Sequence, residues 1–278
     1  MPYFTTSDGL SLHYTDEGTG TPVLCLAGLT RNGDDFQFVR PHLSAYRMIT
    51  LDSRGRGKSD FDKDYMNYSL QREALDALEL LAHLQLEKVV ILGTSRGGLI
   101  AMGLGPTHAH VMQGVILNDI GPRIEDRGMA RIFTYVGRAP DLKTLKEAAA
   151  ALANAERARF FNVSEQRWLD QAAAIYDETP DGIALRYDAR LLDALRDQRV
   201  GDEIPEMWEF FDSLNDIPMA VIRGEHSDLL SDATVQEMAQ HHPGLITCTV
   251  PDRGHVPFLD EPEALDAIHA VMKQAETS

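Results

Sequence analysis

The chain has 278 residues, of which 44% are hydrophobic and 25% are charged. This composition is ordinary for a globular protein, and the length suits one large α/β core with an inserted segment. The formal net charge of −17 disfavours nucleic acid and anionic membrane surfaces as partners, because both repel a strongly acidic protein.

We expect a cytoplasmic protein that carries neither a metal nor a disulfide. Residues 1–6 have no basic start and no long apolar segment, and no later apolar stretch reaches the length of a membrane span. Cys25 and Cys248 lie in strand-like segments, which suits small buried hydrophobic side chains better than a disulfide. No Cys/His spacing suggests a metal, and no glycine-rich loop suggests a bound phosphate or other cofactor. The sequence leaves the oligomeric state open.

The first half of the chain alternates between strand patterns and helix patterns. Residues 10–16 alternate like an exposed antiparallel strand, and Ser69 stands near the start of an amphipathic helix over residues 69–86. Another helix is expected over residues 36–46, after the candidate capping residues Asn32, Asp34 and Asp35. Apolar runs recur between the helical stretches, at residues 22–26, 48–51, 89–92 and 115–117. This alternation predicts a mostly parallel central sheet with helices on both faces.

The apolar run at residues 89–92 leads directly into a Gly-x-Ser-x-Gly pattern at residues 93–97. Between a strand and a helix, this pattern is typical of a nucleophile elbow. The sharp turn holds the hydroxyl of Ser95 clear of the backbone, and Gly93 and Gly97 avoid side chains that would crowd the turn. Ser95 is therefore a candidate nucleophile that needs a general base and an acid to orient that base.

Strand patterns fade between residues 122 and 216, where Ala-rich helical segments such as 142–159 and 164–176 take over. We predict a helical cap at residues 122–216, inserted into a core formed by residues 1–121 and 217–278. The cap carries both tryptophans and several other aromatic side chains, and the sequence does not determine which of them line a pocket.

Two strand-like segments after the cap end in candidate partners for Ser95. Residues 219–224 are followed by Asp228, and residues 246–250 are followed by His255. In an open α/β sheet the active-site groups gather beyond the carboxyl ends of the strands. Both side chains are therefore expected near Ser95.

The stretches at residues 93–97, 223–228 and 254–262 resemble the three catalytic stretches of the α/β-hydrolase family. Residues 26–29 resemble the oxyanion loop of that family, with Ala27 in place of its usual histidine. The segment Asp-Ser-Arg-Gly-Arg-Gly-Lys-Ser that starts at Asp52 resembles the Asp-x-Arg-Gly-x-Gly-x-Ser turn of the family. The likeness covers nearly the whole chain except the middle, and it implies the α/β-hydrolase fold.

The resemblance also implies a role for each residue of the site. Ser95 would be the nucleophile, His255 the general base, and Asp228 the carboxylate that fixes the histidine tautomer. The backbone N–H groups of Leu29 and Arg96 would form the oxyanion hole. The implied activity is that of a serine hydrolase, a carboxylesterase that cleaves small to medium esters through a Ser-His-Asp acyl-enzyme mechanism.

Other residues compete for these roles. Asp119 follows the strand at residues 115–117, and some family members place the acid there, but the sequence around Asp228 is the closer match to the family. Asp52 and Arg54 are expected to brace the elbow through hydrogen bonds rather than take part in the chemistry. The remaining candidate bases lack the Gly-His-x-Pro setting of His255 and are expected at the surface or at helix ends: His226, His241 and His242.

The same triad would also serve a lactonase, an amidase or a C–C bond hydrolase, and a hydrolase scaffold can act as a ligand-binding protein without turnover. A serine in the elbow argues against the haloalkane dehalogenases and epoxide hydrolases of the family, which resemble one another in using an aspartate nucleophile. Family members that cleave C–C bonds commonly carry tryptophan after the Gly-His pair, where this chain has Val256. The physiological substrate, its acyl length and its stereochemistry are not determined by the sequence.

Overall fold

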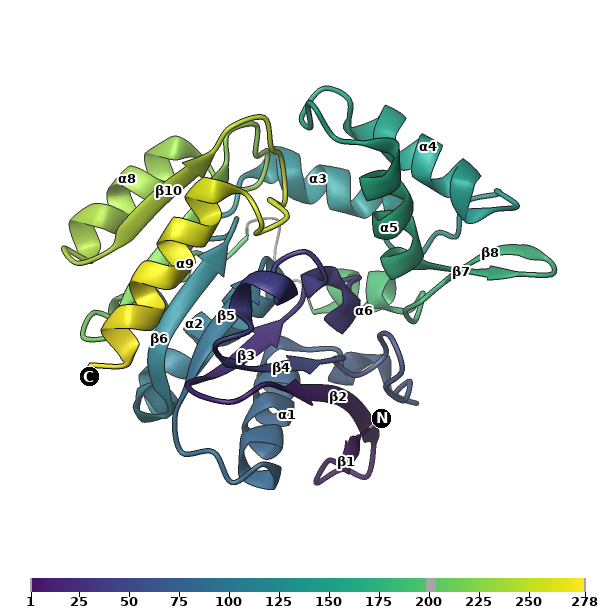
Figure 1. Cartoon of the computed structure of the whole chain (residues 1–278). Helices are drawn as coiled ribbons and strands as arrows, with labels where there is room; N and C mark the ends of the chain where they lie inside the picture. The colour runs from purple at the N-terminus through teal and green to yellow at the C-terminus, as the bar shows by residue number, and fades with distance from the viewer. Residues whose placement is uncertain (1, 199–203, 278) are drawn as a thin grey trace.

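The structure is a computed structural model that describes residues 2–198 and 204–277. Its centre is an eight-stranded sheet with the strand order β1-β2-β4-β3-β5-β6-β9-β10 (Figure 1). The six strands from β4 to β10 in this order run parallel to one another. At the other edge, β2 pairs antiparallel with both β4 and β1. The strands are β1 (Tyr3–Thr5), β2 (Ser11–Glu17), β3 (Pro22–Leu26), β4 (Arg47–Leu51), β5 (Val89–Thr94), β6 (Met112–Asn118), β9 (Met219–Gly224) and β10 (Ile246–Val250). The predicted α/β fold with a mostly parallel sheet is confirmed.

Helices cover both faces of the sheet. One face carries α1 (Leu70–His83), α2 (Arg96–His108) and α8 (Asp232–His241), and the other carries α9 (Pro262–Ala275). The side chains of β5 alternate between the two layers, because Val89 and Ile91 pack with α2 whereas Val90 and Leu92 pack with α9. Strands buried on both faces have continuous apolar runs, which is the pattern that the sequence shows.

The local expectations for the first half of the chain are met in part. Ser69 is the N-cap of α1, and its side chain accepts a hydrogen bond from the N–H of Arg72. Asn32 likewise caps the next turn. The continuous helix expected over residues 36–46 is wrong, because the structure has two 3₁₀ helices there, Gly33–Phe36 and Arg40–Leu43. Pro41 lacks the N–H that a helix begun at residue 36 would need.

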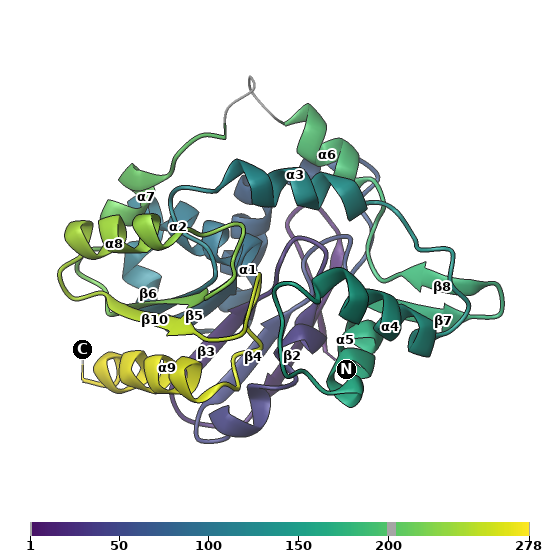
Figure 2. The ribbon, with the colours of Figure 1, turned by 90° about the horizontal axis from the view of Figure 1, so that it is seen from above.

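The part of the segment between β6 and β9 from α3 (Asp126–Tyr135) to α6 (Leu191–Asp197) lies beyond the carboxyl ends of the parallel strands (Figure 2), whereas α7 (Trp208–Asp212) packs against α2. The helices expected over residues 142–159 and 164–176 are α4 and α5, whereas the β7-β8 hairpin was not expected. Its turn is Thr-Pro-Asp-Gly, a recognisable turn sequence in which Gly182 adopts a φ of +127°. The elements of the segment are α3 (Asp126–Tyr135), α4 (Leu145–Glu156), α5 (Glu165–Ile175), β7 (Tyr176–Thr179), β8 (Gly182–Leu185), α6 (Leu191–Asp197) and α7 (Trp208–Asp212).

The boundaries of the cap at residues 122 and 216 stay a prediction. Residues 1 and 278 of the predicted core and residues 199–203 of the predicted cap lie outside the described residues. None of the helices in the described part of the chain combines the length and the apolar character needed to cross a bilayer. Cys25 in β3 and Cys248 in β10 are buried, as their strand-like surroundings predicted.

Candidate active site

Ser95 lies at the sharp turn between β5 and α2. Its backbone has a φ of +49°, and its N–H donates to the carbonyl of Asn118 at 3.0 Å. A Cβ at Gly93 would lie 2.6 Å from the backbone of Gly97, and a Cβ at Gly97 would collide with the carbonyl oxygen of Leu26. The two glycines therefore allow the close approach of strand and helix that presents the serine.

A continuous hydrogen-bond chain links Ser95 to a histidine and a carboxylate. His255 Nε2 lies 3.0 Å from Ser95 Oγ, and His255 Nδ1 lies 2.8 Å from Asp119 Oδ2. His255 follows β10 and Asp119 follows β6, so the ends of three parallel strands bring these side chains together. The structure thus brings the predicted Ser95 and His255 together, and it places the carboxylate of Asp119 on the far side of the histidine ring.

The prediction that Asp228 orients His255 is wrong in this geometry. Asp228 forms ion pairs with Arg131 at 2.8 Å and with Arg159 at 3.8 Å. In the turn after β9, the residue before Asp228 contacts Asp119 instead. This residue is Ser227, whose Oγ donates to Asp119 Oδ2 at 2.7 Å.

Asp119 is held by more than one donor. The N–H of Gly224 donates to Asp119 Oδ1 at 2.8 Å, while Ser227 and His255 share Oδ2. The residue is fully buried and its backbone φ is +54°. These contacts fix the carboxylate against the histidine ring and satisfy its charge in the interior.

The two predicted oxyanion donors lie on either side of Ser95. A Cβ built on Gly28 would lie 3.8 Å from the Cβ of Ser95, so the loop that carries Leu29 runs beside the serine. Arg96 is the first residue of α2, and its N–H therefore has no intrahelical acceptor. Within the described residues, the N–H of Leu29 has no acceptor either. The oxyanion role of these N–H groups stays a prediction.

A buried ionic network, which sequence reasoning missed, ties these two segments together. Glu73 of α1 accepts from Arg56 Nη1 and from Arg96 Nε, both at 2.8 Å. Arg56 Nε also donates to the carbonyl of Leu29 at 2.9 Å. Burial acts to raise the pKa of Glu73, but the guanidinium groups of Arg56 and Arg96 outweigh it and hold the pKa below its ordinary value. The sequence features that could have indicated this network are Arg56 in the 52–59 turn and Glu73 on the inner face of α1.

In the charged turn at residues 52–59, Asp52 and Arg54 form hydrogen bonds with neighbouring loops and with α1, and none of those in the described residues reaches the elbow itself. Asp52 accepts hydrogen bonds from the N–H of Gly33 at 2.7 Å and from the N–H of Lys58 at 3.0 Å. Arg54 is completely buried and donates to Asp76 and Asp62 at 2.6 Å each. Asp52 and Arg54 thus fix loops next to the elbow.

The other candidate histidines are engaged away from the serine. His241, at the end of α8, pairs with Asp212 at 2.7 Å, and His242, the C-cap of that helix, faces the carbonyl of Ile217 at 3.0 Å. His226 is partly exposed and packs edge-on against Phe161. These positions agree with the expected surface or helix-end placement.

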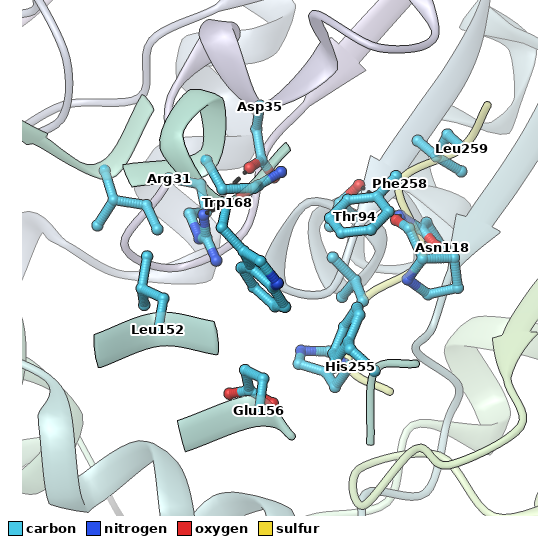
Figure 3. A pocket seen from close by; sticks show the side chains of 15 residues that line it. Arg31, Asp35, Thr94, Asn118, Leu152, Glu156, Trp168, His255, Phe258 and Leu259 are labelled. Atoms are coloured by element: carbon cyan, nitrogen blue, oxygen red, sulfur yellow. Dashed lines mark hydrogen bonds and ion pairs between the residues drawn. The ribbon is translucent and has the colours of Figure 1, made fainter. Parts of the chain in front are cut away.

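Two cavities of different chemistry meet at the hydrogen-bond chain. A cavity of about 260 Å³ is lined by Ser95, the two residues of the predicted oxyanion hole and mainly aliphatic side chains such as Ile120 and Leu229. A cavity of about 460 Å³ is lined by His255, by three arginines and by tyrosines. A smaller pocket beside His255 contains Arg31, Asp35 and Trp168 (Figure 3).

Only some of the cap aromatics face these cavities. Phe133 lines the aliphatic cavity, Tyr135 and Tyr187 line the arginine-containing one, and Phe160 lines the smaller pocket together with Trp168. The other tryptophan stacks on His241 with ring centroids 4.5 Å apart. These positions follow from the packing of the cap helices, which the sequence does not determine.

The model of the alpha/beta hydrolase family matches residues 23–268, which is most of the chain. The chain belongs to the alpha/beta hydrolase family. The crystal structure of an alpha/beta hydrolase from Novosphingobium aromaticivorans is 36% identical to this chain, with a TM-score of 0.92 over 98% of this chain and 97% of that one.

Curated relatives of this alpha/beta hydrolase include enzymes with assigned substrates. The 3-hydroxybutyrate-oligomer hydrolase of Cupriavidus necator is 34% identical over 86% of this chain and 84% of its own length. The 2-(acetamidomethylene)succinate hydrolase of Mesorhizobium japonicum is 25% identical over 88% of this chain and 85% of its own length. Family membership together with these relatives makes this chain a hydrolase.

Proposed function

We propose that this alpha/beta hydrolase cleaves carboxylic esters of small to medium size through an acyl-enzyme on Ser95. The observation that carries the proposal is the hydrogen-bond chain from Ser95 through His255 to Asp119, with steps of 3.0 and 2.8 Å. A serine hydroxyl becomes a useful nucleophile when a base takes its proton and a carboxylate holds that base in the required tautomer. All three groups are present in this order of contact.

The reaction proceeds in two halves. Ser95 Oγ attacks the ester carbonyl while His255 Nε2 takes the serine proton, and Asp119 keeps the Nδ1–H of the ring in place. The N–H groups of Leu29 and Arg96 stabilise the oxyanion. His255 then protonates the departing alcohol, and a water molecule activated by the same ring releases the acid from Ser95.

The two cavities set the size of the substrate. The aliphatic cavity of about 260 Å³ contains Ser95 and the oxyanion donors, so it receives the acyl group. Its volume suits a short or medium acyl chain. The relative named as a 3-hydroxybutyrate-oligomer hydrolase supports an ester substrate, because units of a hydroxy acid join through ester bonds.

Hydrolysis of p-nitrophenyl esters over a series of acyl lengths tests the proposal, with wild type compared with Ser95→Ala. We expect wild type to release nitrophenol and Ser95→Ala to lose at least about 10³-fold in kcat/KM. An organophosphonate should add one stable adduct to wild type, seen as an intact-protein mass shift, and none to Ser95→Ala. A wild type that is labelled at Ser95 yet turns over no ester would contradict the ester substrate and favour a lactone, an amide or a ligand-binding role.

A further inference from the structure

The alcohol half of the substrate must lie on the His255 side of the site. In the proposed reaction His255 gives its proton to the leaving oxygen, so the group attached to that oxygen occupies the cavity that His255 lines. That cavity, of about 460 Å³, contains Arg31, Arg131 and Arg159 but only one acidic lining residue, Glu156. The acyl cavity, in contrast, has a mainly aliphatic lining. The cavity on the His255 side also has aliphatic lining residues, so its three arginines are what distinguishes it from the acyl cavity.

Arg31 is placed to meet the alcohol group directly. It follows the oxyanion loop and lines both pockets that contain His255. Figure 3 shows Arg31, Glu156 and His255 on different sides of the smaller of these pockets. The side-chain hydrogen bonds of Arg31 within the described residues use the same nitrogen, Nη1, which donates to Gln171 at 3.0 Å and to Asp35 at 3.3 Å. Neither Nε nor Nη2 of Arg31 forms a hydrogen bond with another described residue, so both can donate to a ligand in the pockets that Arg31 lines.

The carboxylate beside Arg31 is that of Asp35, which forms a long ion pair with it. Asp35 is buried, and this burial raises its pKa above the ordinary value by more than Arg31 and His255 lower it. The contact between Asp35 and Arg31 measures 3.3 Å. Among the described residues, Asp35 is the carboxylate that pairs with Arg31, and the two meet through this one long contact.

More arginines lead from the surface to this cavity. Arg131 and Arg159 line both the inner cavity and an adjoining outer groove of about 610 Å³. Glu156 and Asp228 balance the charges of these two arginines. The groove also contains Arg127 and Arg223, whose hydrogen bonds go to backbone carbonyls and which have no ion pair with any carboxylate in the described residues.

The outer groove is lined by four arginines and two carboxylates, Glu225 and Asp228, and this cationic excess stands out on a chain whose net charge is −17. The overall charge of the molecule repels small anions, whereas a concave groove with unbalanced arginines raises their local concentration. The groove leads to the side of the site where the alcohol product is formed. Its position therefore favours an anionic alcohol group over a neutral one.

We propose that the substrate is an ester whose alcohol part carries a carboxylate, as in an O-acyl hydroxy acid, and that Arg31 binds this carboxylate. The inference rests on the proposed esterase function. Attack by Ser95 forms the acyl-enzyme and breaks the bond between the carbonyl carbon and the alcohol oxygen. The proton that His255 took from Ser95 passes to that oxygen, so the first product is the free hydroxy acid. Water then releases the acyl group as a carboxylic acid.

A matched pair of substrates tests the inference: O-butyrylglycolate and its primary amide, O-butyrylglycolamide, which lacks only the negative charge. The measured quantity is the ratio of kcat/KM for the two esters, with hydrolysis followed by chromatography. We expect wild type to prefer the carboxylate ester, and Arg31→Gln to lower the ratio about 10- to 100-fold, mainly through KM. Arg31→Lys should restore part of the ratio because it restores the charge without the planar fork.

Arg40→Gln is the control for loss of one positive charge, since Arg40 pairs with Glu17 on another part of the surface. We expect it to keep the wild-type ratio. A second readout is inhibition by glycolate, which should weaken in Arg31→Gln and reappear in part in Arg31→Lys. This readout requires only that the variant still cleaves a p-nitrophenyl ester, and a circular dichroism spectrum checks the fold.

The outcomes separate this inference from the proposed function. Equal kcat/KM values for the two esters in wild type, or an unchanged ratio in Arg31→Gln, would overturn the role of Arg31 while leaving the esterase in place. Failure of wild type to cleave either ester, together with absence of organophosphonate labelling at Ser95, would instead overturn the esterase function itself.

Discussion

At the scale of single residues, Asp119 and Asp228 can be separated by matched substitutions. Asp119→Asn replaces the carboxylate that holds His255 Nδ1, so we expect kcat/KM for a p-nitrophenyl ester to fall about 10³- to 10⁴-fold. Asp228→Asn alters ion pairs with Arg131 and Arg159, and we expect a loss of less than about 10-fold. Steady-state kinetics measures kcat/KM of both variants, and circular dichroism checks that both are folded. The opposite order of effects would show that Asp228 is the working acid.

The same residues show where local sequence stops being informative. The motif around Asp228 matches the family closely, but which carboxylate reaches His255 depends on the backbone direction after β6 and β9. Asp119 adopts a φ of +54°, and Ser227 donates to it, and neither feature can be deduced from a short motif. Ser95 and His255 could be predicted because the elbow and the Gly-His pair each specify their own local geometry.

At the scale of elements, two of the four glycines in helix α2 have opposite requirements. A Cβ at Gly97 would collide with the carbonyl oxygen of Leu26, whereas a Cβ at Gly103 would meet no atom within 4 Å. We expect Gly97→Ala to lower the free energy of unfolding by at least about 3 kcal/mol, because backbone cannot move aside as a side chain can. Gly103→Ala should raise it by about 0.5–1 kcal/mol through helix propensity. Urea unfolding measures both.

Similar losses of stability in the two alanine variants would contradict this account of the elbow, since helix propensity alone treats the two positions alike. Their contrast also explains what sequence could predict at this scale. Continuous apolar runs indicate buried strands and periodic ones indicate amphipathic helices, so the sequence predicts most of the core. The Glu73 network could not be predicted, because it joins loops and a helix that become neighbours only after folding.

At the scale of the whole molecule, acidic residues outnumber basic ones, and the stability of the fold depends on pH through carboxylates whose pKa is shifted. For Asp52, burial acts to raise the pKa, but hydrogen bonds from His13 and from the N–H groups of Gly33 and Lys58 outweigh it, so the pKa lies below the ordinary value of 3.8. Asp52 therefore stabilises the fold above about pH 4, and this contribution is lost as the pH falls through the folded-state pKa. Asp35 acts in the opposite direction, since burial raises its pKa above 3.8. The folded state takes up that proton before the unfolded state does, which favours folding as the pH falls.

The opposite signs of these two groups give a prediction for acid unfolding. The free energy of unfolding, measured in urea at several values between about pH 3 and pH 7, has a slope equal to the difference in bound protons between the unfolded and folded states. We expect Asp52→Asn to make this slope shallower below about pH 4, by up to about 1.4 kcal/mol per pH unit for one proton. Asp35→Asn should raise the slope above about pH 4, where only the folded state holds the Asp35 proton, because the variant removes this opposing contribution. Changes of the same sign in both variants would contradict the assigned directions, and they would mean that the surroundings of one of the two carboxylates differ from those described.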